Sequence, residues 1–130
     1  MTTLTDAAKA LIDAPEYATV ATIDPDGQPQ LSVVWISRDA DALLFSTIRG
    51  RRKTANLERD GRASLLVFPR ENPYQYLEIR GSVTLTDDPQ AAYIDEMARK
   101  YTEHQTYPWG QPGEQRVIAR LTPDHVVFRA

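Results

Sequence analysis

The hydrophobic positions of this 130-residue chain change their period along its length, and the changes outline short helices and many short strands. In residues 4–13 the apolar side chains recur at intervals of three and four, which is the spacing of one helix face. Thr3 or Thr5 can cap this helix, and Pro15 follows its end. Residues 17–23 are rich in β-branched and aromatic side chains, which predicts a strand.

A meander of strands and tight turns follows this first strand. The segment Asp-Pro-Asp-Gly at 24–27 joins it to a second strand at 28–37, because proline presets φ and glycine accepts the left-handed position that follows. Residues 38–41 form a second tight turn before a third strand at 42–47. Strands joined so closely are expected to pair antiparallel.

The middle of the chain predicts a helix and a strand of unusual pattern. Gly50 ends the third strand, and a helix is expected at 51–59. The fourth strand, at 62–68, hardly alternates between apolar and polar residues. This pattern indicates a strand that is buried on both faces. We therefore expect one face to lie on its own core and the other against a partner chain.

The remaining elements complete an all-β pattern. They are a strand at 74–86 with a bulge or bend at Gly81, a helix at 89–101, a loop at 102–114, and closing strands at 115–121 and 125–129 that Pro123 separates. Six or seven short strands with accessory helices predict a mainly β fold, a small antiparallel barrel that forms a single domain over 1–130. The missing β-α-β alternation and the missing G-x-G-x-x-G motif argue against a Rossmann sheet.

Composition limits the chemistry that the chain can perform without help. There is no cysteine, and the two histidines are far apart in the sequence, so we expect no thiol catalysis and no metal site. The net charge of −3 argues against bulk nucleic-acid binding. No apolar run reaches the ~20 residues of a membrane span, and no export signal precedes the first helix, so we expect a cytoplasmic protein. An enzyme of this kind would depend on a bound cofactor.

Basic residues are concentrated in one segment, since four of the 15 Lys and Arg residues lie at 49–53. The start of a helix offers free N–H groups to an anion, and Arg and Lys side chains complete such a site. Arg51 and Lys53 can both reach a phosphate there, and Asn56 lies one turn further along. The alternative interpretation is a solvated basic turn.

A second segment, at 26–34, combines turn residues with an edge-like strand. Pro29 lacks an N–H group, so it suits the opening or the edge of a strand. Free backbone groups at an edge could bond the polar rim of a flat ring. Taken alone, however, the segment is a hairpin with ordinary turn chemistry.

Together these segments resemble a known superfamily. The motifs are Asp-Gly-x-Pro-Gln-Leu-Ser at 26–32, Arg-x-Lys-Thr-x-Asn-Leu at 51–57, Arg-Asp-x-Arg-Ala-Ser at 59–64 and Arg-Val-Ile-Ala-Arg-Leu-Thr-Pro-Asp-His-Val at 116–126. Their order and spacing resemble the flavin and deazaflavin oxidoreductases, the split β-barrel group that includes pyridoxamine 5′-phosphate oxidase. The strongest resemblance is to the actinobacterial branch that uses coenzyme F-420.

The resemblance implies an FMN-binding type of split barrel that forms a homodimer, with two cofactor sites at the subunit interface. It implies that Arg51 and Lys53 contact the cofactor phosphate with support from Asn56, and that Ser46 and Thr47 line the phosphate and ribityl path. The other positions that it assigns to the cofactor are Pro29, Gln30, Ser32 and Val34 beside the ring, Tyr74 and Tyr76 from the fifth strand, and Trp109 with Tyr107 from the other protomer.

The activity implied by the resemblance is F-420-dependent hydride transfer to a small conjugated or heteroaromatic substrate. Tyr74, Tyr76 or solvent could supply the accompanying proton, so no catalytic residue is assigned. An FMN-dependent enzyme like pyridoxamine 5′-phosphate oxidase is one alternative, because both cofactors share a ring outline and a phosphate. A non-catalytic carrier of the cofactor and a structural barrel without any cofactor are the others.

Overall fold

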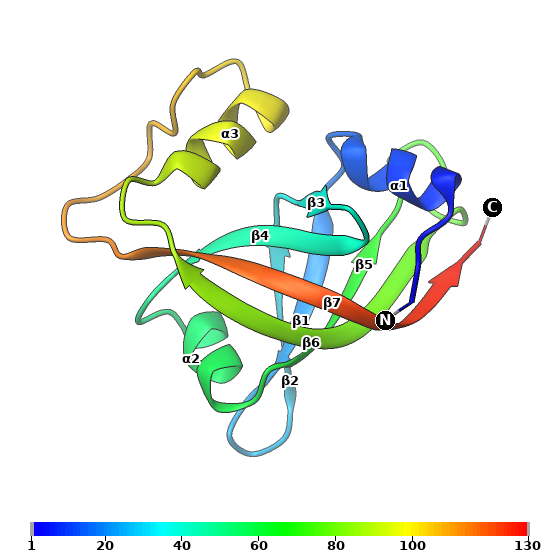
Figure 1. Ribbon diagram of the computed structural model, residues 1–130, viewed down its shortest axis with the longest axis horizontal. Helices are drawn as coiled ribbons and strands as arrows, with labels where there is room; N and C mark the ends of the chain where they lie inside the picture. Colours follow the sequence, from blue (N-terminus) through cyan, green and yellow to red (C-terminus); the bar gives the residue numbers. More distant parts are fainter. Residues whose placement is uncertain (1, 130) are drawn as a thin grey trace.

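The computed structural model describes residues 2–129 and shows one curved antiparallel sheet with three helices around it (Figure 1). The strands are β1 (Ala18–Ile23), β2 (Pro29–Val34), β3 (Ser37–Asp39), β4 (Ala42–Ile48), β5 (Arg62–Val67), β6 (Leu77–Asp87) and β7 (Arg116–Phe128). The helices are α1 (Asp6–Asp13), α2 (Arg52–Arg59) and α3 (Ala92–Tyr101). This architecture confirms the predicted mainly β split barrel.

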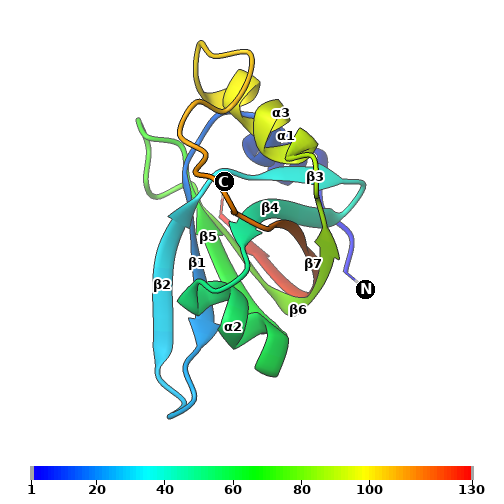
Figure 2. The same cartoon turned by 90° about the vertical axis from the view of Figure 1, so that its left-hand side faces the viewer.

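The sheet order is β2-β1-β5-β6-β7-β4-β3, so the two long strands β6 and β7 join its two halves. Figure 2 shows the β1–β2 hairpin extending along one side of the molecule, with α2 beside it and α3 at the opposite end. The inner face of the curved sheet carries the main core, which includes Phe45, Leu65 and Leu121, each at most 1% exposed. Helix α1 adds Leu11 and Ile12 to the same core.

The second predicted strand, at 28–37, is wrong as a single element. Strand β2 ends at Val34 and pairs with β1, whereas β3 begins at Ser37 and pairs with β4. Because β2 and β3 are the two edges of the sheet order, the chain must cross from one edge to the other between them. The connecting residues Trp35 and Ile36 therefore belong to no strand, although they continue the apolar pattern.

The closing strands are one continuous strand, so the predicted interruption at Pro123 is also wrong. Pro123 lies opposite Gly81, and a register shift follows between Arg80 and Gly81. A bulge tolerates proline because a ladder hydrogen bond is already missing there. The predicted bulge at Gly81 is confirmed, and a Cβ atom at this position would overlap the carbonyl oxygen of Thr122.

Two predicted elements begin later than expected. Residues 74–76 form a turn, so β6 starts at Leu77. Residues 89–91 also form a turn, which places the start of α3 at Ala92. The carboxylate of Asp88 accepts the first free N–H groups of α3 and thereby fixes this start.

In the single chain strand β5 is buried on one face only, and the predicted burial of its other face against a partner chain stays a prediction. Leu65 and Val67 face the core, whereas Leu66 is 38% exposed on the outer face. Leu31 and Val33 of the neighbouring hairpin are 65% and 67% exposed. We call the outer apolar side chains Leu31, Val33, Leu66 and Phe68 the outer apolar face.

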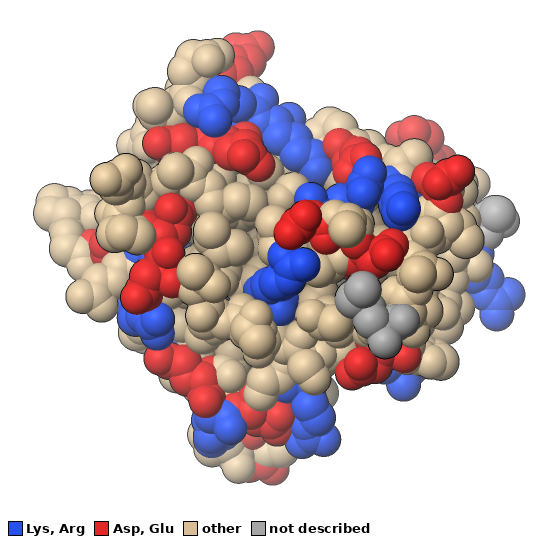
Figure 3. Space-filling view, in the orientation of Figure 1, with Lys and Arg blue, Asp and Glu red and all other residues tan. Residues whose placement is uncertain are grey.

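The surface shown in Figure 3 carries acidic and basic side chains in alternation, with no broad field of one sign. Within residues 2–129, no helix has the length and apolar character that crossing a bilayer requires.

Candidate functional site

The start of α2 is open to solvent and, within residues 2–129, lacks a capping side chain. Gly50 turns the chain after β4 with a φ of 93°, a left-handed value that favours glycine. Arg51 then occupies the N-cap position with an extended backbone and makes no side-chain capping bond. The first turn of the helix therefore presents uncapped N–H groups, together with the positive end of the helix dipole.

The four bases at 49–53 divide into two paired and two unpaired side chains. Arg49 pairs with Asp87 at 2.8 Å and with Glu58 at 2.9 Å. Arg52 pairs with Asp24 at 3.1 Å. Among residues 2–129, no carboxylate lies within 4.0 Å of the charged groups of Arg51 or Lys53. The two side chains that the sequence assigns to a phosphate are therefore the two that lack a protein partner.

Lys53 is a partly buried cation beside another cation. Burial and, to a smaller extent, the charge of Arg51 together lower the pKa of its amine from 10.5 to about 8. Its Nζ atom lies 5.9 Å from the centre of the Phe45 ring. An anion bound between Lys53 and Arg51 would offset both effects, because an opposite charge favours the protonated amine.

Asn56 holds α2 in place from behind the site. Its side-chain amide donates hydrogen bonds of 3.0 Å to the Thr22 hydroxyl and to the Asp24 carboxylate. These bonds attach the helix to the end of β1. The Asn56 amide therefore supports α2 through protein partners, and its predicted role beside the cofactor phosphate stays a prediction.

The open end of α2 borders a pocket of about 220 Å³ below α3, which we call the site pocket. Its lining residues are Tyr17, Val33, Val34, Trp35, Ser46, Arg51, Lys53, Ile94, Tyr107 and Arg116. Four of the predicted site residues thus come together: Val34, Ser46, Arg51 and Lys53. Tyr107 lines the pocket of its own chain, so no partner is needed to bring it there.

Aromatic rings form one side of the site pocket. The Trp35 ring stacks on Tyr101 of α3 at 5.3 Å and meets Tyr107 edge-on at 6.1 Å. Trp109 lies outside the pocket, 53% exposed, and packs edge-on against Tyr107 at 5.5 Å. Trp109 therefore supports the wall rather than lining it.

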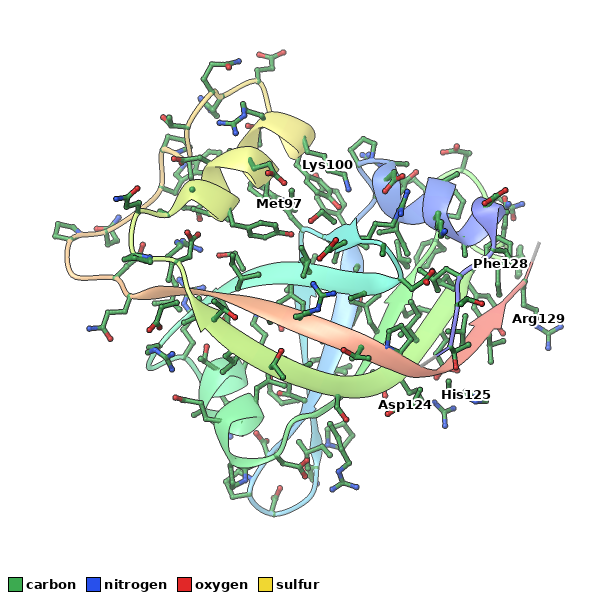
Figure 4. All side chains as sticks on the ribbon, in the orientation of Figure 1. Met97, Lys100, Asp124, His125, Phe128 and Arg129 are labelled. Atoms are coloured by element: carbon green, nitrogen blue, oxygen red, sulfur yellow. The ribbon has the colours of Figure 1, made fainter. Side chains whose placement is uncertain are left out.

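Helix α3 is fixed above this wall by contacts to two other elements. Figure 4 labels Met97 and Lys100 on this helix. Met97 is buried, and the amine of Lys100 donates to the carbonyl oxygens of Ile12 and Ile36. These contacts hold the aromatic wall in a set position.

Ser32 carries a buried hydroxyl oxygen without a hydrogen-bond partner within residues 2–129. It lies on the same face of β2 as Val34 and Gln30, because side chains alternate along a strand. The Gln30 side chain accepts a 2.8 Å bond from Thr22. An unpartnered buried hydroxyl is uncommon and indicates a polar group that would satisfy it.

The remaining predicted residues lie elsewhere in the single chain. Thr47 faces away from the pocket and bonds Thr54 at 2.9 Å, since neighbouring residues of β4 point to opposite faces. Pro29 borders a different hollow, beside Gly81. Tyr74 is 84% exposed, and Tyr76 lines a hollow on the outer apolar face.

Sequence reasoning missed Tyr17, Trp35 and Arg116. Arg116 is 8% exposed, and its Nη1 donates to Ser46 at 3.2 Å. These three residues come from segments far apart in the chain, so no local motif connects them.

Neither histidine lines the pocket. His104 packs on Trp109, and His125 lies beside Asp124 on the distal part of β7, which ends near Phe128 and Arg129 (Figure 4).

The fold and this site define a split-barrel protein in which, within residues 2–129, the uncapped start of α2 lies beside two bases without carboxylate partners. The family model for pyridoxamine 5′-phosphate oxidase matches residues 4–130, and the chain belongs to this family.

Curated relatives carry the same family name. The pyridoxine/pyridoxamine 5′-phosphate oxidase of Aeromonas hydrophila is 37% identical over 81 residues, which are 62% of this chain and 38% of that protein. The enzyme of the same name from Rhodopseudomonas palustris is 30% identical over 135 residues, covering 95% of this chain and 62% of its own length. The chain thus spans between about two fifths and three fifths of the length of these two relatives.

Solved structures are similar over nearly the whole chain. An F420 reductase is 28% identical with a TM-score of 0.84, and the match covers 95% of this chain and 98% of that one. A pyridoxamine 5′-phosphate oxidase-related, FMN-binding protein from Nostoc punctiforme shares the fold at 16% identity, with a TM-score of 0.66 and coverage of 96% and 84%.

Proposed function

We propose that this protein is a coenzyme F-420-dependent oxidoreductase that delivers a hydride to a small conjugated or heteroaromatic acceptor. The observation that carries the proposal is the uncapped start of α2 with its two unpaired bases, Arg51 and Lys53. The similarity to an F420 reductase along almost the full length of both chains favours F-420 over FMN.

The residues present fit a phosphate-bearing tricyclic cofactor on three independent counts. Arg51 and Lys53 lack carboxylate partners among the described residues and line one pocket. No side chain of the described residues caps the N–H groups at the start of α2. The buried hydroxyl of Ser32 lacks a partner within residues 2–129, and it lies on the strand face that the resemblance assigns to the ring.

When bound, a reduced deazaflavin supplies a hydride and does not readily perform one-electron chemistry. The protein must then bind, orient and enclose it. Arg51 and Lys53 would hold the phosphate through charge-assisted hydrogen bonds, each contributing about 1.5–3 kcal/mol. Val34 and Trp35 would limit the orientation of the ring, and Tyr107 would exclude water from the same side.

We also propose that the active form is a homodimer whose contact is the outer apolar face. Leu31 and Val33 are more than half exposed on neighbouring positions of one strand face, which favours burial by a second chain. The site pocket of about 220 Å³ is smaller than most ligand sites, which supports completion by a partner. Tyr74 and Tyr76, which lie outside the pocket of their own chain, would then reach the partner's site.

Cofactor binding is tested first by titrating the purified protein with F-420 and with FMN while recording tryptophan fluorescence. Trp35 lines the pocket, so a bound ring should quench it. We expect saturable quenching by F-420 at lower concentration than by FMN. Tighter binding of FMN would support the FMN-dependent alternative, and no binding of either would contradict the proposal.

A second measurement distinguishes an enzyme from a carrier that binds the cofactor without catalysing its oxidation. Reduced F-420 is mixed with the protein and a conjugated acceptor, and the return of the oxidised absorption is followed. We expect turnover beyond one equivalent of protein. Binding without any acceptor-dependent oxidation, across a panel of acceptors, would identify a carrier instead.

A further inference from the structure

Arg116 is a buried guanidinium with most of its hydrogen-bonding capacity unused. It is 8% exposed, and within residues 2–129 its side chain donates one hydrogen bond, from Nη1 to Ser46. A guanidinium has five N–H donors. Within residues 2–129, the Ser32 hydroxyl oxygen is the one buried side-chain N or O atom that lacks a hydrogen-bond partner. The other donors of Arg116 also lack a hydrogen bond but are not among the buried atoms, so they are accessible to solvent or to a ligand.

The guanidinium lies where two hollows meet. Arg116 lines the site pocket and also a second hollow of about 380 Å³, which Arg49 and Gln115 border as well. The ring of Tyr107 faces it, with the ring centre 4.7 Å from its Cζ atom. This stacking fixes the plane of the guanidinium, so its N–H edge has a defined direction.

The carboxylate nearest to Arg116 is only loosely engaged. Glu114 Oε1 lies 3.6 Å from Nη2, beyond hydrogen-bond distance, and the same oxygen accepts a 3.0 Å bond from the Gln111 backbone. A carboxylate of better geometry would form two parallel bonds with a guanidinium, and such pairs are stronger than single contacts. Glu114 therefore leaves room for a competing carboxylate.

We propose that Arg116 is a second anion-binding residue of the site and that it binds a carboxylate attached to a planar, conjugated group. The planar part would pack beside Tyr107 and Trp35, and the carboxylate would replace Glu114 at the guanidinium. This inference rests on the proposed function, because it names the acceptor class for the same pocket. It also separates two anion positions: a phosphate at Arg51 and Lys53, and a carboxylate at Arg116.

The carboxylate could belong to the acceptor or to the flexible tail of a bound cofactor. Both have the same group, and the planar neighbour distinguishes them. Cinnamate serves as the planar probe, a glutamyl-glutamate dipeptide as the flexible probe, and cinnamamide as the uncharged control. Each is titrated into the cofactor-free protein with tryptophan fluorescence and calorimetry, so that the result does not depend on F-420 binding.

Two variants are expected to change the cinnamate affinity in opposite directions. Arg116→Gln should weaken binding by about tenfold, since a charge-assisted pair is lost. Glu114→Gln should strengthen it by about threefold, because a competing nearby charge is removed while the amide oxygen still accepts the Gln111 bond. If Arg116 had only a structural role, Glu114→Gln would not increase the affinity for cinnamate.

The control variant is Arg49→Gln, which removes another arginine of the second hollow that is already paired with Asp87. It should leave the cinnamate affinity unchanged. If Arg116→Gln proves unstable, Arg116→Lys and Glu114→Gln carry the test. Equal affinities of the wild-type protein for cinnamate and cinnamamide, or no gain in Glu114→Gln, would overturn the proposal. Stronger binding of the dipeptide than of cinnamate would overturn the planar assignment.

Discussion

Helices α2 and α3 each follow a strand of the sheet, but they differ in whether a side chain accepts the free N–H groups of the first turn. At α3 the Asp88 carboxylate accepts the N–H groups of Ala92 at 3.2 Å and Tyr93 at 3.0 Å. At α2 the N-cap is Arg51, which makes no capping bond. One helix start is completed by the chain itself, and the other keeps its donors and two positive charges free.

This difference indicates that the start of α3 serves stability, and we propose that the start of α2 serves ligand binding. A capped first turn adds stability, and substitution of a capping residue typically costs about 1 kcal/mol. An uncapped turn with adjacent cations lowers stability until an anion is present. The comparison predicts that changes at α2 act mainly on ligand affinity and changes at α3 mainly on stability.

The largest effect is expected from the double variant Arg51→Gln/Lys53→Met. Loss of two charge-assisted contacts to a phosphate should weaken F-420 binding by about a hundredfold. Calorimetric titration measures the affinity, and thermal unfolding of the same sample tests whether the fold is kept. Arg52→Gln is the matched control, because its side chain is 71% exposed and already paired with Asp24. A similar loss of affinity in that control would show that the cofactor is attracted by the overall positive charge of this segment rather than by Arg51 and Lys53 specifically.

The next effect concerns α3. Asp88→Ala removes both capping bonds at its start and should lower the free energy of unfolding by about 1–2 kcal/mol. Denaturant unfolding measures this change. Cofactor affinity should change far less than in the double variant, and a loss of affinity without a loss of stability would refute the comparison.

A smaller and opposite stability effect is expected when α2 receives the cap that it lacks. Arg51→Asp places a carboxylate at the N-cap, which should raise the free energy of unfolding by about 1 kcal/mol. The same carboxylate occupies the anion position, so F-420 binding should weaken. Unchanged stability in this variant would indicate that the first turn is already satisfied.

The smallest effect is a pH dependence of Lys53. Its folded-state pKa of about 8 is lower than the usual 10.5, so between these pH values the unfolded chain keeps a proton that the folded chain has released. The stability of the cofactor-free protein should therefore gain a contribution as pH rises from 8 to 10.5. Lys53→Met lacks this contribution, and the difference between the two proteins isolates it from other titrating groups.

Cofactor affinity should change in the opposite direction over the same range, because the neutral amine no longer attracts a phosphate. Titrations at pH 7.5 and 9.5 compare the wild-type protein with Lys53→Met. An equal pH dependence in both proteins would show that Lys53 is not the responsible group.

Much of the fold could be predicted because local signals coincided with it. The Asp-Pro-Asp-Gly turn, the helix at 51–59 and the Gly81 bulge all depend on residues near in sequence. The wrong predictions lie where strand pairing between residues far apart in the sequence determines the structure. Trp35 and Ile36 continue an apolar run but cross between sheet edges, and Pro123 is tolerated because its partner strand shifts register at Gly81.

The site was predictable to the extent that it is a local motif. Arg51 and Lys53 share one turn of chain, and both line the pocket. Thr47 was assigned beside Ser46, yet strand alternation directs it to Thr54 on the other face. Arg116 and Trp35 reach the pocket only through the folded sheet, so the sequence offered no spacing that identified them.

We propose that the start of α2 binds the cofactor through its phosphate. The most direct test compares the affinity of F-420 with that of its analogue that lacks the phosphate and tail, in the wild-type protein and in Arg51→Gln/Lys53→Met. We predict that the wild-type protein binds the intact cofactor at least about tenfold more tightly than the analogue, and that the double variant loses this preference. An equal preference for the intact cofactor in both proteins would contradict the account.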